Sequence, residues 1–217
     1  MNGNILCFGD SNTWGLNPDT WKRYEKDERW TGILTHEMRD EYYVVEEGLN
    51  GRTANETDEE EPFLNGRDYM TACVLSHRPV TVLVVMLGTN DVKFRYNKSA
   101  IQLCDSITEL TCDMERILRN SQEDEFKVIL MAPKSLDERV YGDGTFDEMS
   151  VQKSKELPGL LEQSAAGHGW LFINNDIPEV ELGRDGLHLS RVGHRVIADM
   201  LAKKIRSLYN RNTGERV

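Results

Sequence analysis

The chain has 217 residues, 39% of them hydrophobic, and a formal net charge of −11, which fits a globular protein that buries a core without disulfides or metal. The negative charge disfavours nucleic-acid binding, because phosphate contacts need clustered Lys and Arg side chains. No segment approaches the roughly 20 apolar residues that span a bilayer, and the N-terminus lacks the basic and apolar segments of a signal peptide, so we expect a cytoplasmic protein without a membrane partner.

Five short apolar runs rich in β-branched residues predict strands over residues 4–8, 42–46, 80–87, 126–131 and 170–173. The third run is apolar on both faces, as a central parallel strand is. Apolar residues at helical spacing predict helices over 30–39, 69–76, 101–118 and 191–209. Strands that alternate with helices predict one α/β domain over residues 1–217, with a five-stranded parallel sheet covered on both faces.

Two long segments interrupt this alternation. Residues 53–65 are acidic and irregular, and Lys134–Leu157 is a long connection after the fourth predicted strand. Long loops in a compact domain are often functional, and loops at the carboxyl ends of parallel strands line the binding crevice. We therefore consider residues 134–157 a candidate for substrate recognition, although an exposed insertion or a subunit contact explains them equally well.

The cysteines give no support for a metal or redox site. They are widely spaced and form no C-x-x-C pair, so we expect free thiols in a reducing compartment. The four are Cys7, Cys73, Cys104 and Cys112.

A serine directly follows the first predicted strand. The motif Gly9-Asp10-Ser11 stands at the strand's carboxyl end, where a side chain projects into the crevice of a parallel sheet and helix N–H groups meet developing negative charge. The same residues also make an ordinary turn with a helix N-cap. Taken alone, the motif leaves Ser11 open as either a nucleophile or a turn residue.

A serine nucleophile needs a base, and the base needs an orienting carboxylate. The segment Asp185-Gly-Leu-His188 offers both, because on a turn the carboxylate reaches Nδ1 of the imidazole and leaves the other ring nitrogen free for the serine. His188 is also explained as a turn residue before the last helix. The remaining histidines lack an adjacent orienting acid or lie in a Gly-His-Gly turn; they are His36, His77, His168 and His194.

A reacting oxygen that becomes negative needs hydrogen-bond donors. Asn90 follows the third strand within Gly88-Thr-Asn-Asp91 and offers its side-chain amide, and Gly51 follows the second strand with an unobstructed backbone N–H. Each piece is also plain turn chemistry. However, the nucleophile, both donors and the acid–base pair all follow strands at one end of one predicted sheet, which favours a catalytic site.

These blocks, in this order, resemble the four conserved blocks of SGNH/GDSL hydrolases, and the resemblance runs from about residue 4 to residue 208. The segments Ile5–Gly15, Arg29–Gly32, Glu46–Leu49 and Met86–Asp91 are similar to bacterial arylesterase/acyltransferases of that family. The resemblance implies a flavodoxin-like three-layer α/β/α fold and a serine esterase that acts on short-chain acyl esters. It implies no metal and no organic cofactor.

The resemblance also assigns roles residue by residue. Ser11 would be the nucleophile, His188 the base and Asp185 its orienting acid, and the oxyanion hole would comprise the N–H groups of Ser11 and Gly51 with the side chain of Asn90. Members of the arylesterase subgroup include octamers in which alcohols compete with water, so the resemblance implies a homo-oligomer and acyl transfer to alcohols. The segment after Met131 matches no motif of the family and leaves the acyl pocket undefined.

Alternatives remain at this point. A carbohydrate O-acetylesterase or an acyl thioesterase would use the same residues on the same fold. A non-catalytic binding module is disfavoured because the set of site residues is complete, and a flavodoxin-like cofactor protein is disfavoured because no phosphate-binding loop follows the first strand.

Three further residues near the motifs have two interpretations each. Trp14 either walls the substrate pocket or belongs to the core under the first helix. Arg52 either binds a carboxylated substrate or lies exposed beside a turn. Asp10 is interpreted as structural, holding the turn around Ser11 through backbone N–H groups.

Overall fold

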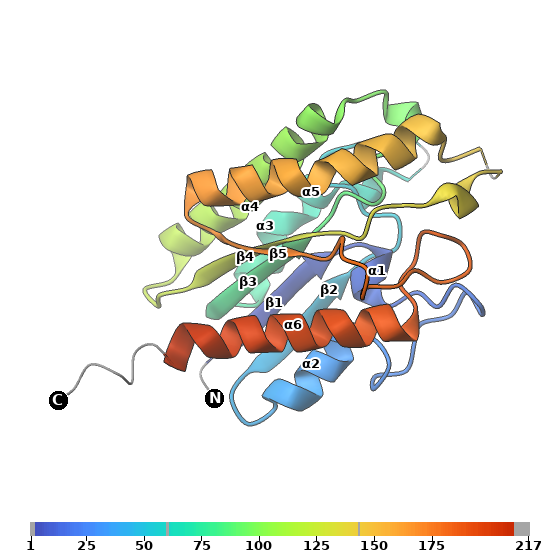
Figure 1. The fold of residues 1–217 in the computed structure, drawn as a ribbon. Helices are drawn as coiled ribbons and strands as arrows, with labels where there is room; N and C mark the ends of the chain where they lie inside the picture. The colour runs from blue at the N-terminus through green and yellow to red at the C-terminus, as the bar shows by residue number, and fades with distance from the viewer. Residues whose placement is uncertain (1–2, 60, 143, 211–217) are drawn as a thin grey trace.

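The strands form one parallel sheet with the order β2-β1-β3-β4-β5 (Figure 1). The computed structural model describes residues 3–59, 61–142 and 144–210. Every neighbouring pair of strands is parallel, so all five carboxyl ends meet at one edge. The strands are β1 (Asn4–Gly9), β2 (Tyr43–Gly48), β3 (Val80–Met86), β4 (Lys127–Ala132) and β5 (Leu171–Asn174).

Helices cover both faces of the sheet, which makes three layers. In Figure 1, α2 and α6 lie on one face and α3, α4 and α5 on the other. The helices are α1 (Ser11–Trp14), α2 (Trp30–Met38), α3 (Gly66–Ser76), α4 (Ala100–Ser121), α5 (Glu148–His168) and α6 (Arg191–Asn210), with short 3₁₀ turns at Pro62–Leu64, Phe94–Tyr96 and Glu138–Val140. Within the described residues, no helix combines the length and the apolar character that crossing a bilayer requires.

The sheet divides the core in two, as the interior strand β1 shows. Its alternating residues point to opposite faces, so that Leu6 and Phe8 pack with α3, α4 and α5, while Ile5 and Cys7 pack with α2 and α6. All four side chains are at most 1% exposed. This arrangement confirms the predicted α/β architecture with both faces covered.

The predicted elements are present, and their bounds differ from the observed ones by at most three residues. The exception is the connection predicted over 134–157, which is wrong as a loop, because α5 begins at Glu148 within it. Asp147 caps this helix by accepting a 2.7 Å hydrogen bond from the N–H of Ser150. The sequence did not predict this helix, because polar residues such as Lys153 interrupt the apolar spacing of its buried face and because Pro158 lies in its interior.

Leu157 tests whether this helix is part of the core. It is fully buried, and its Cδ2 would lie 2.6 Å from a Cβ added to Gly88. We expect Leu157→Ala to lower the free energy of unfolding by about 2–5 kcal/mol in urea denaturation, because it leaves a cavity. Met149→Ala on the same helix, where the side chain is 60% exposed, should cost less than about 0.5 kcal/mol. Equal losses in the two variants would contradict the packing described.

Candidate functional site

The first strand positions Ser11 at the carboxyl edge of the sheet. β1 ends at Gly9, and Asp10 caps α1 by accepting a 2.9 Å hydrogen bond from the N–H of Asn12. Gly9 has no room for a side chain, since a Cβ there would lie 2.1 Å from Oγ1 of Thr13 and 2.7 Å from a carbonyl oxygen of β3. This close packing places Ser11 as the first residue of α1, where it is 4% exposed.

His188 and Asp185 reach Ser11 from the far end of the chain. Nε2 of His188 lies 3.0 Å from Oγ of Ser11, and Nδ1 lies 2.7 Å from Oδ2 of Asp185. The other carboxylate oxygen accepts the N–H groups of Leu187 and His188, each at 3.0 Å. The structure therefore brings these three predicted site residues into one hydrogen-bonded line.

The surroundings of Asp185 keep its carboxylate ionised. Burial raises the pKa of Asp185, but hydrogen bonds from the His188 ring and from two backbone N–H groups outweigh burial, so the pKa lies below its ordinary value. The carboxylate is charged at neutral pH and faces Nδ1 of a histidine that is 5% exposed. A charged partner at that position stabilises an added proton on the imidazole.

Asn12, which the motif analysis did not single out, holds the His188 segment in place. Its side-chain oxygen accepts the N–H of Leu189 at 2.9 Å, and its amide donates to the carbonyl oxygen of Leu187 at 3.3 Å. The residue beside Ser11 thus grips the backbone on both sides of His188. The Gly-Asp-Ser motif gave no signal for this contact, because the partners lie about 175 positions along the chain.

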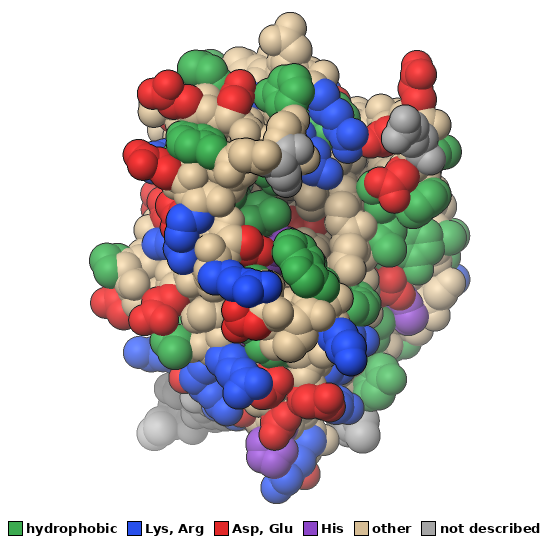
Figure 2. Space-filling model, turned by 90° about the vertical axis from the view of Figure 1, so that its right-hand side faces the viewer, with side chains coloured by type: hydrophobic (Ala, Val, Ile, Leu, Met, Phe, Trp, Pro, Cys, Tyr) green, Lys and Arg blue, Asp and Glu red, His purple; other side chains and the backbone are tan. Residues whose placement is uncertain are grey.

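The predicted oxyanion donors lie beside the end of β1. The N–H of Leu49 donates to the carbonyl oxygen of Gly9 at 3.1 Å, which draws the loop after β2 towards β1. In this loop Gly51 has a φ of 83°, a left-handed conformation that favours glycine. Nδ2 of Asn90 donates to the carbonyl oxygen of Arg52 at 3.1 Å, which ties the loop after β3 to the same place. Figure 2 looks onto this edge, which is hollowed near its centre.

The backbone donors of this group are available to a ligand. Among the described residues, neither the N–H of Ser11 nor that of Gly51 donates a hydrogen bond to the protein. Asn90, 6% exposed, uses one amide hydrogen on Arg52 and keeps a second. The three predicted oxyanion donors thus each keep a hydrogen that is free for a ligand.

Arg52 is structural, and the alternative that it lies exposed is wrong. It is 3% exposed, it donates to the carbonyl oxygens of Gly9 and Glu47, and its guanidinium lies 4.2 Å from the ring of Phe8. These hydrogen bonds join the ends of β1 and β2, so the Arg52 side chain stabilises the fold at this edge of the sheet. No observation here supports a contact with a carboxylated substrate.

Trp14 is half-buried, and its observed partner is Arg23. The Arg23 guanidinium lies 5.4 Å from the Trp14 ring, and Nε of Arg23 donates to the Trp14 carbonyl oxygen at 2.7 Å. The aromatic side chain next to His188 is instead Trp21, whose ring centroid lies 6.3 Å from that of the imidazole. The sequence gave no sign of Trp21, because it stands in a loop ten residues after the nucleophile.

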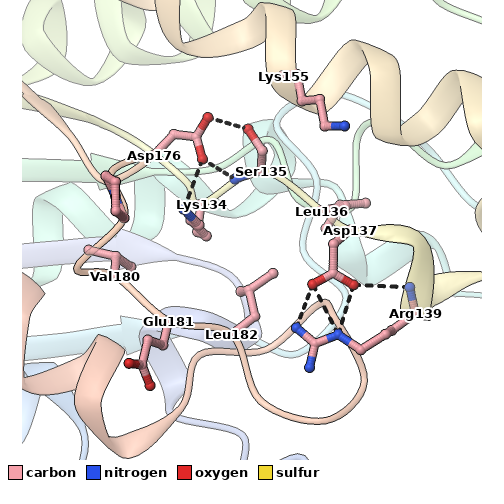
Figure 3. A pocket seen from close by; sticks show the side chains of 11 residues that line it. Lys134, Ser135, Leu136, Asp137, Arg139, Lys155, Asp176, Val180, Glu181 and Leu182 are labelled. Carbon is pink, nitrogen blue, oxygen red and sulfur yellow. Dashed lines mark hydrogen bonds and ion pairs between the residues drawn. The ribbon is translucent and has the colours of Figure 1, made fainter.

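The segment 134–147, which precedes α5, braces the loop that carries Asp185. The N–H of Asp137 donates to the carbonyl oxygen of Gly186 at 3.3 Å, and Arg139 donates to that of Gly183 at 2.7 Å. Beside these contacts lies a pocket of about 570 Å³ with charges of both signs on its walls (Figure 3). Its lining includes Lys134 and Lys155 from the segment considered for substrate recognition, together with Asp176, but none of the predicted catalytic residues or oxyanion donors.

One group among the described residues has the composition of a metal site. Ligand atoms of Glu47, Cys73 and His77 lie within 4.8 Å of one another. Nε2 of His77 already lies 2.7 Å from Oε1 of Glu47, and burial together with the Glu47 charge raises the pKa of Cys73 to about 12. The His77 ring and the Glu47 carboxylate already form a hydrogen bond with each other.

The arrangement at the strand edge suits one kind of chemistry. A hydroxyl faces a histidine that can take its proton, and a charged carboxylate stabilises the histidine once protonated. Among the described residues, the N–H groups of Ser11 and Gly51 at the same edge have no protein acceptor, and N–H groups of this kind can stabilise a carbonyl oxygen that gains negative charge. These parts are what acyl transfer through a serine requires.

Asp91 is a buried acid behind these donors. Its Oδ1 accepts the N–H of Ala54 at 2.7 Å, while Oδ2 has no hydrogen-bond partner among the described residues. Burial, opposed by that N–H and reinforced by Asp10 and Glu56, raises its pKa from 3.8 to about 7. The folded chain therefore holds this proton at pH values where the unfolded chain has released it.

This proton predicts a measurable pH dependence of stability. Between about pH 4 and pH 7 the folded state binds more protons at Asp91 than the unfolded state, so stability falls as pH rises through that window. Asp91→Asn keeps the Oδ1 acceptor and removes the titration. Its free energy of unfolding relative to wild type should rise by roughly 2–4 kcal/mol from pH 4 to pH 8, as followed by urea denaturation.

The control for this experiment is Asp105→Asn on the exposed side of α4. Its stability should track that of the wild type at every pH. Parallel curves for wild type and Asp91→Asn would contradict the buried, protonated state of Asp91.

Comparisons with known proteins place this geometry in a family. The model of the GDSL-like lipase/acylhydrolase family matches residues 7–196. A search of the curated proteins finds no match. The match to the family model confirms the resemblance drawn from the motifs.

Solved structures of similar proteins share the whole fold. An aryl esterase from M. smegmatis is 30% identical over 95% of this chain and 99% of its own, with a TM-score of 0.87. A carbohydrate acetylesterase from Sinorhizobium meliloti is 29% identical over 95% of this chain and 100% of its own, with a TM-score of 0.86. A putative arylesterase from Agrobacterium tumefaciens is 29% identical, covers 94% and 99% of the two chains, and has a TM-score of 0.83. By its family model and by its fold, the chain belongs to the GDSL-like lipase/acylhydrolase family.

Proposed function

We propose that the chain is a serine esterase that hydrolyses short-chain acyl esters through an acyl-enzyme on Ser11. The observation that carries this proposal is the line from Asp185 through His188 to Ser11, with hydrogen-bonding distances of 2.7 and 3.0 Å. Family membership supports a hydrolase. The roles of the individual residues rest on the geometry.

In the first step the ester is cleaved. Nε2 of His188 takes the proton of Ser11 Oγ, and the oxygen attacks the carbonyl carbon of the ester. The negative charge on the carbonyl oxygen is stabilised by the N–H groups of Ser11 and Gly51 and by the amide of Asn90. The tetrahedral intermediate then collapses, and the alcohol leaves with the proton that His188 held.

In the second step the acyl group leaves Ser11. Water enters the space vacated by the alcohol, gives its proton to His188 and attacks the acyl carbon, and Ser11 Oγ recovers the proton from His188. An alcohol that enters instead of water would give a new ester by the same path. The charged Asp185 stabilises the protonated imidazole in both steps.

Two substrate classes follow from the similar structures. Aryl esterases and carbohydrate acetylesterases are both found among them at about 30% identity. The first name refers to esters of aryl alcohols, and the second refers to acetyl esters of carbohydrates. An acetyl ester is therefore our first substrate, and an acetylated sugar is the second candidate.

A series of acyl esters tests the proposal. We expect Ser11-dependent hydrolysis of p-nitrophenyl acetate, with initial rates that fall from acetate through butyrate to octanoate. Ser11→Ala should lose at least about 10⁴-fold in kcat/KM and keep its unfolding midpoint, because only a hydroxyl is removed. Wild-type rates equal to those of Ser11→Ala would sink the proposal, while rates that rise with chain length would indicate a lipase.

A matched acetyl thioester and a monoacetylated methyl pyranoside extend the series. A preference for the thioester would indicate a thioesterase on the same site. A preference for the acetylated sugar would indicate a carbohydrate acetylesterase, and would leave the assigned mechanism unchanged.

The oxyanion assignment has its own test. Removing the amide of Asn90 in Asn90→Ala should lower kcat about 10²–10³-fold with little change in KM, because the interaction forms in the transition state. Asn120→Ala on the exposed face of α4 serves as the control and should not change kcat. A loss that appears in KM alone would mean that Asn90 binds the ground state rather than the oxyanion.

A further inference from the structure

Trp21 is an exposed aromatic residue in an unusual conformation. Its side chain is 62% exposed, and its φ of 58° lies in the left-handed region, which bulky residues rarely adopt. Its ring meets the ring of His188 edge-on, with centroids 6.3 Å apart and an interplanar angle of 84°. An indole held in water at the rim of the site gains little from folding, and its backbone conformation is costly.

The loop that carries Trp21 is firmly fixed. The N–H of Trp21 donates to the carbonyl oxygen of Asn17 at 2.8 Å. Arg184, the neighbour of Asp185, donates from Nε to the carbonyl oxygen of Pro18 at 2.9 Å. The loop also packs closely on the His188 segment, because a Cβ added to Gly183 would lie 2.3 Å from Cγ of Pro18. The indole is thus presented to the site by ordered structure.

A second anchor fixes the far end of the same loop to the sheet. Nε of Arg29 donates to Glu46 at 2.6 Å, and Arg23 donates to the same carboxylate at 2.9 Å. Glu46 lies on β2, so the loop is held at both ends of the segment that contains Trp21. A surface preorganised in this way binds a ligand without first paying the entropy of ordering.

The place of Trp21 relative to His188 says which part of an ester it would touch. In the proposed mechanism the leaving oxygen takes its proton from Nε2 of His188, so the alcohol part must lie on the His188 side of Ser11. Two of the three predicted oxyanion donors, Gly51 and Asn90, come from the loops after β2 and β3, on other elements than the Trp21 loop, and the third, the N–H of Ser11, begins α1. An aromatic ring in edge contact with His188 therefore lies on the side of the site where the alcohol would be.

We propose that Trp21 is a substrate-binding residue that receives a six-membered ring on the alcohol side of the ester. This inference rests on the proposed function and deepens it, since it names the substrate class as esters of ring-bearing alcohols. An aryl ring and the apolar face of a pyranose both pack on an indole. A ring alcohol that accepts the acyl group from Ser11 would occupy the same place as a leaving ring alcohol.

Two acetates separate this role from a structural one. Phenyl acetate and methyl acetate form the same acetyl-enzyme and differ only in the alcohol. Trp21→Ala should lower kcat/KM for phenyl acetate about tenfold, which is the effect expected when one aromatic contact is lost. The same variant should lower kcat/KM for methyl acetate less than twofold. Trp21→Phe should recover most of the loss. Equal losses on the two esters would overturn the proposal, because they would mean that Trp21 acts on His188 or on the fold.

The matched control is Tyr43→Ala, which removes an aromatic side chain that is 59% exposed at the amino end of β2, at the opposite edge of the sheet from Ser11. It should leave both esters unchanged. A methyl pyranoside that carries one acetyl group distinguishes the two sources of the ring. A tenfold loss on this ester in Trp21→Ala would extend the site to sugars, and a loss confined to phenyl acetate would restrict it to aryl alcohols.

A binding measurement keeps the proposal testable if the esterase assignment fails. The chain has four tryptophans, so an NMR spectrum of the ¹⁵N-labelled Ser11→Ala variant should show four indole N–H signals. The signal of Trp21 is identified as the one that disappears in the double variant Ser11→Ala/Trp21→Phe. Titration with phenol and with methyl glucoside should shift this signal more than the other three. A stationary Trp21 signal with both compounds would overturn the proposal, whatever the enzyme hydrolyses.

Discussion

The hydrogen bond between Ser11 and His188 joins two residues that are 177 positions apart, and the rest of the site is arranged around it. It forms because β1 lies in the interior of the sheet and the segment before α6 returns to the same carboxyl edge. The Asn12 side chain forms hydrogen bonds with the backbone of Leu187 and Leu189, which flank His188, and Asp185 fixes the His188 ring from the other side. A 3.0 Å contact between distant parts of the chain thus depends on short-range hydrogen bonds that orient each partner.

The oxyanion side of the site is organised by a different residue. Arg52 donates to the carbonyl oxygens of Gly9 and Glu47, and its own carbonyl oxygen accepts the amide of Asn90. One buried side chain therefore connects the ends of β1 and β2, and its backbone connects them to the loop after β3. The loops that carry the predicted oxyanion donors Gly51 and Asn90 are held by this cross-link, while His188 is held by Asn12 and Asp185.

The strands and most helices were predictable because their apolar residues repeat with a clear period. Ser11, Asp185 and His188 were predictable as site residues because their motifs follow strands whose carboxyl ends lie at one edge of the sheet. Helix α5 was not predictable, since polar residues and Pro158 break the pattern of its buried face. Trp21 was out of reach for another reason. Its position beside His188 depends on a loop closed by contacts to the far end of the chain, and no local pattern encodes such a contact.

The attachment of the Trp21 loop has a consequence for how this protein can change over evolution or in the laboratory. Arg184 holds the loop through the carbonyl oxygens of Pro18 and Asp19. Carbonyl oxygens are present whatever the side chain, so the residues of this loop can be exchanged without loss of those two hydrogen bonds. Libraries confined to positions 18–22 would vary the surface beside His188 while the hydrogen bonds that join Ser11, His188 and Asp185 stay in place. If the chain is the esterase proposed above, this loop is where its range of alcohols would be diversified.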